Sequence, residues 1–215
     1  MDTFLKLKNL KPLAQGSFRW VFQHPENPDL LVKVIHADAM AKRFGKKTRW
    51  YKRPRRYGKY LCFVREIQEF ITVHAQTNTA VPFLQRIVGF AQTDLGLGII
   101  VQAIRNSDGN LAPTLRNLIN NGLYDESIKK SLDDFLALLL ESDVIINDLS
   151  PGNIVYTQNE NNDYLFVMID GLGNNSFVPF KTMSKTINRR SKLKRFDAFY
   201  AKIEHFKKIS NRYPA

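Results

Sequence analysis

The sequence predicts a mixed α+β fold of two lobes, with a small antiparallel sheet in the first lobe and a reduced helical second lobe. Its first half contains short apolar runs bounded by turn residues, and its second half contains longer segments with helical periodicity. A length of 215 residues suits one core or two small lobes better than two independent domains. We therefore expect an N-terminal lobe over residues 1–105 and a C-terminal lobe over residues 106–215.

The composition indicates a globular chain that we expect to be soluble and cytoplasmic. Hydrophobic residues make up 44% of the chain, and no window approaches the run of about 18 apolar residues that spans a membrane. The first residues lack the pattern of a secretory signal. Cys62 is the only cysteine, so no disulfide can form within the chain, and we expect this residue to be packed as a small hydrophobe.

The charge is strongly positive and unevenly distributed. The chain has 32 Lys and Arg against 20 Asp and Glu, a net charge of +12, and the basic residues gather in segments 42–59 and 181–212. Such a balance favours anionic partners: nucleotides, phosphorylated sugars, lipid-linked acceptors, an acidic membrane surface or nucleic acid. Association with the inner face of the membrane is therefore considered beside a free cytoplasmic location.

The first lobe is expected to contain four strand segments and one helix. Residues 10–23 predict a strand with a turn at residues 15–17, and "LLVKVI", residues 30–35, predicts a buried strand with a central lysine. Residues 36–60 form a basic, aromatic-containing insert. Residues 61–75 have helical spacing, and "PFLQRIVGFAQ" and "LGLGIIVQAI" predict two more strands.

The second lobe is expected to be built mainly from helices. Residues 127–146 predict a helix that runs into the stretch "VIINDLSPGNIVY", which then continues as a strand. "YLFVMIDGLG" predicts a strand that ends at Asp170. Residues 183–209 predict a basic amphipathic helix at the end of the chain.

Lys33 lies in the middle of an apolar strand, where an unpaired amine costs free energy. It could reach nucleotide phosphates, or it could lie on an edge strand and face water. Glu66 is the candidate partner that would hold Lys33 as an ion pair. Glu69, on a neighbouring helical face, is the alternative partner, and either glutamate could instead be a surface residue.

Asp148 and Asn153 lie five residues apart across a Ser-Pro-Gly turn. "INDLSPGN" resembles the catalytic loop H-R-D-L-K-P-x-N of protein kinases, in which the acid orients the acceptor hydroxyl and the asparagine binds Mg²⁺. Ile146, Asn147 and Ser150 replace the His, Arg and Lys of that pattern. Asp170, before "GLG", resembles the metal-binding aspartate of D-F-G, although an aspartate there could also cap a turn.

"AQGSFRWVF" resembles a glycine-rich nucleotide loop that keeps one of its three glycines, and an ordinary hairpin turn is the competing interpretation. Gly16, Ser17 and Val21 are the candidate nucleotide-binding residues of this segment. Gln102, at the end of a later predicted strand, is a further candidate.

The order of these parts resembles a protein-kinase-like phosphotransferase. Only about 40 residues follow "DGLG", and nothing similar to A-P-E occurs there. The resemblance therefore implies ATP and Mg²⁺ as cofactors and a small or lipid-linked hydroxyl acceptor instead of a protein.

Three further stretches resemble the YrbL-like family of the PhoP regulatory network: "FQHPENPDLLVKVI", "REIQEF" and "DGLGNNSFVPFKTMSK". The resemblance covers most of the chain and implies a kinase-like fold without implying a substrate.

Three functions are therefore considered. The first is an ATP- and Mg²⁺-dependent phosphotransferase acting on an anionic acceptor, and the second is a nucleotide-binding regulatory module of the pseudokinase type. The third, less favoured, is a nucleic-acid binder suggested by "KRFGKKTRWYKRPRRYGKY". The four histidines have no metal-ligand spacing, and the sequence does not indicate an oligomeric state.

Overall fold

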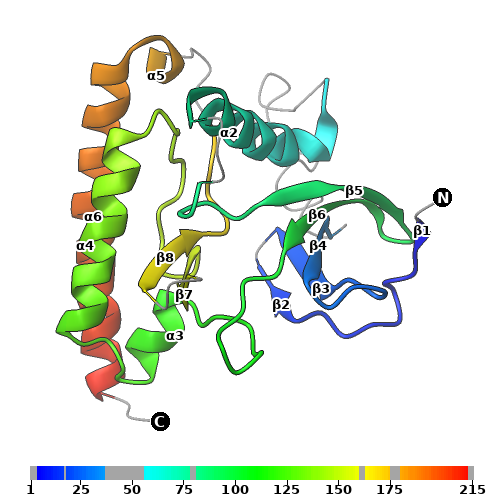
Figure 1. Cartoon of the computed structure of the whole chain (residues 1–215), viewed down its shortest axis with the longest axis horizontal. Helices are drawn as coiled ribbons and strands as arrows, with labels where there is room; N and C mark the ends of the chain where they lie inside the picture. Colours follow the sequence, from blue (N-terminus) through cyan, green and yellow to red (C-terminus); the bar gives the residue numbers. More distant parts are fainter. Residues whose placement is uncertain are drawn as a thin grey trace, which may run out of the picture. The chain divides into compact units, whose positions relative to one another are not determined.

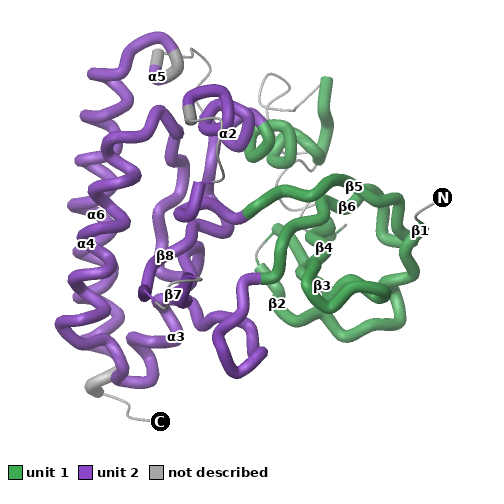
Figure 2. The backbone as a smooth tube through the Cα atoms, in the orientation of Figure 1, with its two compact units in different colours: residues 1–67, 86–103 green, residues 68–85, 104–215 purple. Residues whose placement is uncertain are grey.

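The computed structural model describes residues 4–16, 18–36, 56–77, 81–159, 163–174 and 180–212. The chain forms two compact units: residues 1–67 with 86–103, and residues 68–85 with 104–215 (Figure 2). The described part is mixed α+β, as the sequence predicts. The assignment of residues 1–105 and 106–215 to nucleotide-binding and catalytic lobes stays a prediction.

The first unit contains a six-stranded sheet (Figure 1). Its strand order is β1-β5-β6-β4-β3-β2, and neighbouring strands are antiparallel except for the parallel pair β1–β5. The strands are β1 (Phe4–Leu5), β2 (Ala14–Gln15), β3 (Arg19–Gln23), β4 (Leu30–Ile35), β5 (Ile87–Thr93) and β6 (Gly96–Gln102).

A short helical segment and a longer helix accompany this sheet in the chain. They are the 3-10 turn η2 (Gly58–Tyr60) and helix α2 (Leu61–Thr77). The division between the two units falls inside α2, after Ile67.

The alternation of side chains along β4 determines where its lysine points. Val32 and Val34 belong to one apolar cluster, whereas Leu31 and Ile35 belong to another that includes Phe63 of α2. Successive strand residues point to opposite faces of a sheet, so Lys33 shares the face of Leu31 and Ile35. The central lysine therefore lies on the side of the sheet that packs against α2.

The second unit contains helices and a two-stranded antiparallel sheet. Helix α4 packs beside the long helix α6 (Figure 1). A core of apolar residues such as Leu132, Leu139, Phe166 and Phe199 lies among these elements. The elements of the second unit are α3 (Leu115–Asn120), α4 (Glu126–Glu141), β7 (Ile154–Gln158), β8 (Tyr164–Met168), α5 (Phe180–Met183) and α6 (Lys185–Arg212).

The prediction of a continuous helix over residues 127–146 is wrong at its C-terminal end. Helix α4 ends at Glu141, where the Ser142 hydroxyl donates to the Leu139 carbonyl and Ser142 itself is extended. Residues 144–146 then run as irregular chain, and Ile146 forms an isolated bridge with Leu172. The bridge and the β-branched side chains favour extended backbone over another helical turn.

The predicted strand over residues 10–23 is also too long. Only β2 and β3 are strands, and they are joined through the hydrogen bond from the Gly16 amide to the Arg19 carbonyl at 2.8 Å. Strand β1 and helix α3 were not predicted. Ser17, residues 37–55 of the basic insert and residues 175–179 lie outside the described residues.

No helix in the described ranges is long and apolar enough to cross a membrane.

Candidate functional site

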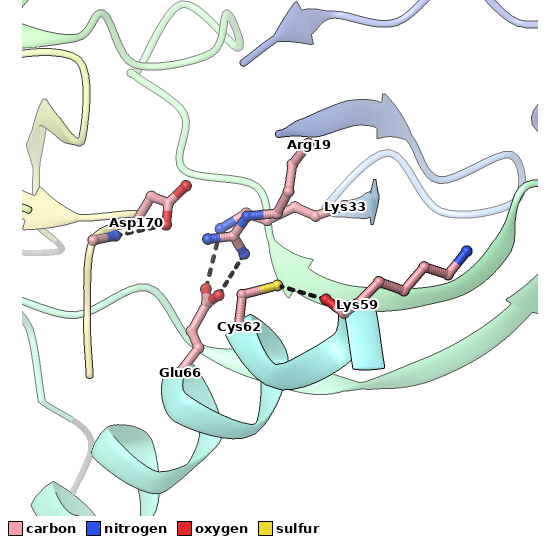
Figure 3. Close-up of polar contacts among 7 residues, drawn as sticks. Arg19, Lys33, Lys59, Cys62, Glu66 and Asp170 are labelled. Carbon is pink, nitrogen blue, oxygen red and sulfur yellow. Dashed lines mark hydrogen bonds and ion pairs between the residues drawn. The ribbon is translucent and has the colours of Figure 1, made fainter. Parts of the chain in front are cut away.

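Lys33 and Glu66 form an ion pair inside the first unit (Figure 3). The Lys33 Nζ lies 3.5 Å from the Glu66 Oε1, and both residues are buried. Strand β4 and helix α2 provide the two side chains, and Phe63 packs in the cluster between them. Because the amine has a carboxylate partner, its charge is retained at low solvent exposure.

Arg19 of β3 joins the same carboxylate and was not predicted as part of this site. Its NH1 lies 2.5 Å from the Glu66 Oε2, a shorter contact than that of Lys33 (Figure 3). The sequence signal was present, because Arg19 occupies the third glycine position of the nucleotide-loop pattern. An arginine at the start of β3 can reach across the sheet face to α2, which glycine cannot.

The three charges determine the ionisation of Glu66. Burial acts to raise the pKa of this carboxyl, but the charges and hydrogen bonds of Arg19 and Lys33 outweigh it and lower the pKa below its usual range. Glu66 is therefore a stable anion between two cations.

The predicted alternative partner, Glu69, faces a different part of the protein. Its Oε2 accepts a hydrogen bond from the Ile145 amide at 2.7 Å, within the second unit. Burial raises the pKa of Glu69 to about 7, against the opposing effects of the Ile145 amide and the Lys192 charge. The structure therefore pairs Lys33 with Glu66, while Glu69 supports the chain that leads to Asp148.

The other predicted nucleotide-binding residues have varied surroundings. Val21 lies opposite Lys33 in the β3–β4 register and packs against the α2-side cluster. An added Cβ at Gly16 would meet the Arg19 carbonyl at 3.4 Å, an ordinary contact, so the fold does not demand glycine there. Gln102 is exposed at the end of β6. Their nucleotide-binding role, with that of Ser17, stays a prediction.

Asp148 and Asn153 lie together at the two ends of a tight loop in the second unit. The Asn153 Nδ2 donates to the Asp148 carbonyl at 2.9 Å and lies 3.4 Å from the Asp148 Oδ2. The Asn153 amide donates to the Ser150 carbonyl at 2.9 Å, which closes the turn. The Asp148 side chain is 57% exposed, so its carboxylate is accessible to a substrate.

The segment that carries Asp170 is hydrogen-bonded to this loop. The amides of Asn147 and Asp148 both donate to the Gly171 carbonyl, and the Ile169 amide donates to the Asn153 carbonyl. An added Cβ at Gly171, whose φ is +88°, would lie 2.1 Å from the Asp148 carbonyl oxygen. Only glycine permits this approach of the two chains.

The Asp170 carboxylate faces its own chain on one side, where Oδ1 accepts from the Gly171 amide at 2.6 Å. Asp170 and Asn153 lie on the two paired segments and offer oxygen atoms, the donors that Mg²⁺ prefers. Among the described residues, no group of three His, Cys, Asp or Glu could hold a metal ion. Mg²⁺ often takes only one or two protein ligands and completes its shell with phosphates and water, so the oxygen atoms of Asn153 and Asp170 are of the kind that it binds. Their role as metal ligands stays a prediction.

Basic residues of α6 contact the same loop and were not predicted. The Lys202 Nζ lies 3.6 Å from the Asp148 Oδ1 and 3.4 Å from the Leu149 carbonyl oxygen. The Arg195 NH1 donates to the Asn147 carbonyl. Sequence reasoning placed them only in a basic amphipathic helix, because no local pattern tells which turn of α6 packs beside residues 147–149.

The fold and the site together define an α+β protein with a buried Arg-Lys-Glu cluster in one unit and an Asp-loop-Asn element joined to a second aspartate in the other. The family described as PhoP regulatory network protein YrbL matches residues 5–204, and the chain belongs to this family.

Two relatives share the name "Uncharacterized protein YrbL", one from Escherichia coli (strain K12) and one from Shigella flexneri. Each is 22% identical to this chain over 186 residues, which cover 84% of this chain and 79% of the relative.

Proposed function

We propose that this protein is an ATP- and Mg²⁺-dependent phosphotransferase of two-lobed, protein-kinase-like fold that acts on a hydroxyl group of an anionic acceptor. The observation that carries the proposal is the pairing of the Asp148–Asn153 loop with the segment of Asp170. One accessible carboxylate and two oxygen-bearing side chains on adjoining segments match the needs of phosphoryl transfer.

In this proposal, the predicted site residues have different roles. Lys33, held by Glu66, is the cation for the nucleotide phosphates, since its charge is retained although the side chain is buried. Asn153 and Asp170 would hold Mg²⁺, which neutralises phosphate charge when bound. Asp148 orients the acceptor hydroxyl and takes its proton.

A second candidate function is supported by Arg19. This arginine occupies a glycine position of the nucleotide loop and makes the shorter contact to Glu66. A side chain of that size at a glycine position of the predicted loop favours a regulatory module that binds a nucleotide without transferring phosphate. The family description as a PhoP regulatory network protein agrees with such a role.

Calorimetric titration of ATP with Mg²⁺ tests the nucleotide and metal sites. The unmodified protein should bind, and Asp170→Ala should weaken binding about tenfold or more because a charged metal ligand is lost. Asp134→Ala, which removes an exposed aspartate of α4, is the matched control. If the unmodified protein does not bind ATP with Mg²⁺, both candidate functions are wrong.

Acceptor-dependent ADP release then separates the two functions. Phosphorylated sugars and lipid-linked sugars are the acceptors to screen, with Asp148→Asn as the variant. An enzyme should lose turnover by roughly a hundredfold or more while nucleotide binding survives. If ATP binds but no acceptor stimulates ADP release, the regulatory module is supported. Equal turnover in the unmodified protein and in Asp148→Asn would refute the assignment of Asp148 as the base.

A further inference from the structure

A groove of about 530 Å³ lies beside Asp148, entirely within the second unit. Its polar lining includes Asp148, Arg116, Lys202 and His205, and part of its apolar lining is Ala198, Ala201 and Phe206. Asp148 is the acidic member of the lining, beside two permanent cations. The groove therefore combines the proposed base with a positively charged wall.

One face of α6 forms this wall. Ala198, Ala201, Lys202 and His205 recur at intervals of three and four residues, so they lie on the same side of the helix. The two alanines leave room above the catalytic loop, where larger side chains would fill the groove. Their methyl groups offer an apolar surface of the kind that packs against ring carbons.

Arg116 is held in place beside Pro151 of the Asp148–Asn153 loop. Its amide donates to the Pro151 carbonyl at 2.9 Å, which ties the start of α3 to the loop. Its guanidinium lies 5.0 Å from the centre of the Phe206 ring, and an added Cβ at Gly152 would lie 3.5 Å from its Cζ. A planar guanidinium positioned between a ring and the loop backbone can present its donors to a phosphate in a defined direction.

Lys202 provides the second cation, from a different element. Its contact with Asp148 is long, at 3.6 Å, and the two side chains are 48% and 57% exposed. Exposed pairs of this kind contribute little to stability, about 0–1 kcal/mol. Among the described residues, no carboxylate forms an ion pair with Arg116. Ion pairing within the fold therefore does not account for the two cations.

We propose that this groove is the acceptor site and that it takes a phosphomonoester of a polyhydroxylated compound, such as a sugar phosphate. Arg116 and Lys202 bind the phosphate that the acceptor already has, and the sugar lies along Ala198 and Ala201 with one hydroxyl at Asp148. The inference rests on the proposed phosphotransfer and adds to it the site and the charge of the acceptor.

The proposed reaction transfers the γ-phosphoryl group of ATP to the acceptor hydroxyl. The acceptor oxygen forms a bond to the γ-phosphorus of ATP while the bond from that phosphorus to the bridging oxygen breaks. ADP leaves with the bridging oxygen, and the hydroxyl proton passes to the Asp148 carboxylate and then to water.

Proton NMR of the His205 imidazole tests the site without ATP, because this ring lines the groove. The His205 signals, assigned with His205→Gln, should shift on titration with glucose 6-phosphate and with inorganic phosphate, but not with glucose. Lys202→Met and Arg116→Gln should each weaken glucose 6-phosphate binding about tenfold, the scale of one charge-assisted hydrogen bond. Lys130→Met and Arg190→Gln, which change exposed residues elsewhere in the unit, should not weaken it.

The outcomes separate this inference from the proposed function. If neither phosphate probe shifts the His205 signals, or if the Lys202 and Lys130 variants behave alike, the acceptor site is wrong. If an acceptor stimulates ADP release and Lys202→Met and Arg116→Gln both release ADP at the unmodified rate, the phosphotransfer is supported and the acceptor site is wrong. If the probes bind more weakly to the groove variants and equally well to the control variants, but no acceptor stimulates ADP release, the anion site is supported and the phosphotransfer is wrong.

Discussion

Glu69 shows how one buried carboxyl can make the second unit sensitive to pH. It lies in α2, is 5% exposed and accepts a hydrogen bond from the Ile145 amide. Lys192 of α6 is also buried, and it donates to the carbonyls of Leu139 and Ser142. Burial lowers the pKa of Lys192 to about 8, although the charges of Asp143, Glu69 and Glu141 oppose this effect.

The raised pKa of Glu69 predicts that this residue lowers stability as pH rises. Between the usual value of 4.5 and the folded value of about 7, the unfolded chain loses the proton while the folded chain keeps it. The folded state therefore binds more protons, and the free energy of unfolding falls across that window. Relative to Glu69→Gln, the unmodified protein should lose up to about 3 kcal/mol between pH 4 and pH 8.

Urea denaturation of both proteins at several pH values measures this difference. Glu26→Gln removes an exposed carboxylate and is the matched control. The glutamine can still accept the Ile145 amide, so the hydrogen bond is preserved while the charge is removed. A difference between the two proteins that does not change with pH would contradict the burial of an ionisable group at this position.

Sequence reasoning at the residue scale succeeded where an unusual residue could be recognised from its immediate neighbours in the chain. A lysine inside "LLVKVI" must find an anion, and the structure provides Glu66. For Arg19 it overlooked the residue's position in the nucleotide-loop pattern. It failed for Arg116 and Lys202, because their significance depends on which distant segments pack beside them. Basic residues are common in this chain, so their identity alone carried no signal.

At the scale of elements, helix α4 has a clear N-terminal signal. The Asp125 Oδ1 accepts a hydrogen bond from the Ile128 amide at 2.8 Å, which satisfies one of the free amides at the helix start. Leu132, Phe135 and Leu139 on the inner face of α4 then enter the core of the second unit. The cap therefore stabilises an element on which much of that core depends.

Asp125→Ala should lower the free energy of unfolding by about 1 kcal/mol, within a range of about 0.5–2 kcal/mol. Asparagine also caps helices well, so Asp125→Asn should lose only a few tenths of that amount. Chemical denaturation followed by far-ultraviolet circular dichroism compares the two variants. Equal losses in both would show that the charge of Asp125, and not its hydrogen bond, is what matters.

The periodic elements were predictable and their ends were less so. Strand β4 begins and ends where the apolar run predicts, and α2 follows its helical pattern closely. The end of α4 was missed because Val144 and Ile145 continue an apolar pattern after the helix has stopped. Helix α3 is only six residues long, too short for a periodicity to be recognised.

At the scale of the whole molecule, the net charge of +12 should limit stability at low ionic strength. Like charges repel more in the compact state than in the extended chain, and salt screens that repulsion. The screening length falls from about 30 Å at 0.01 M salt to about 10 Å at 0.1 M.

The melting temperature should therefore rise between about 0.01 M and 0.1 M salt and change less beyond that range. Differential scanning calorimetry in NaCl and in KCl checks this and separates general screening from binding of a particular cation. A melting temperature that falls over the same interval would mean that favourable ion pairs outweigh the repulsion.

The close approach at Gly171 has a consequence for how related sequences can diverge. If the proposed phosphoryl transfer is correct, Asp148 and Asp170 are needed only where that chemistry is retained, and a relative without it is free to change them. Gly171 is required by the backbone geometry and not by the chemistry, since any side chain there would overlap the Asp148 carbonyl oxygen. Among distant relatives, a retained glycine with altered aspartates would mark lineages that keep the architecture without the proposed reaction.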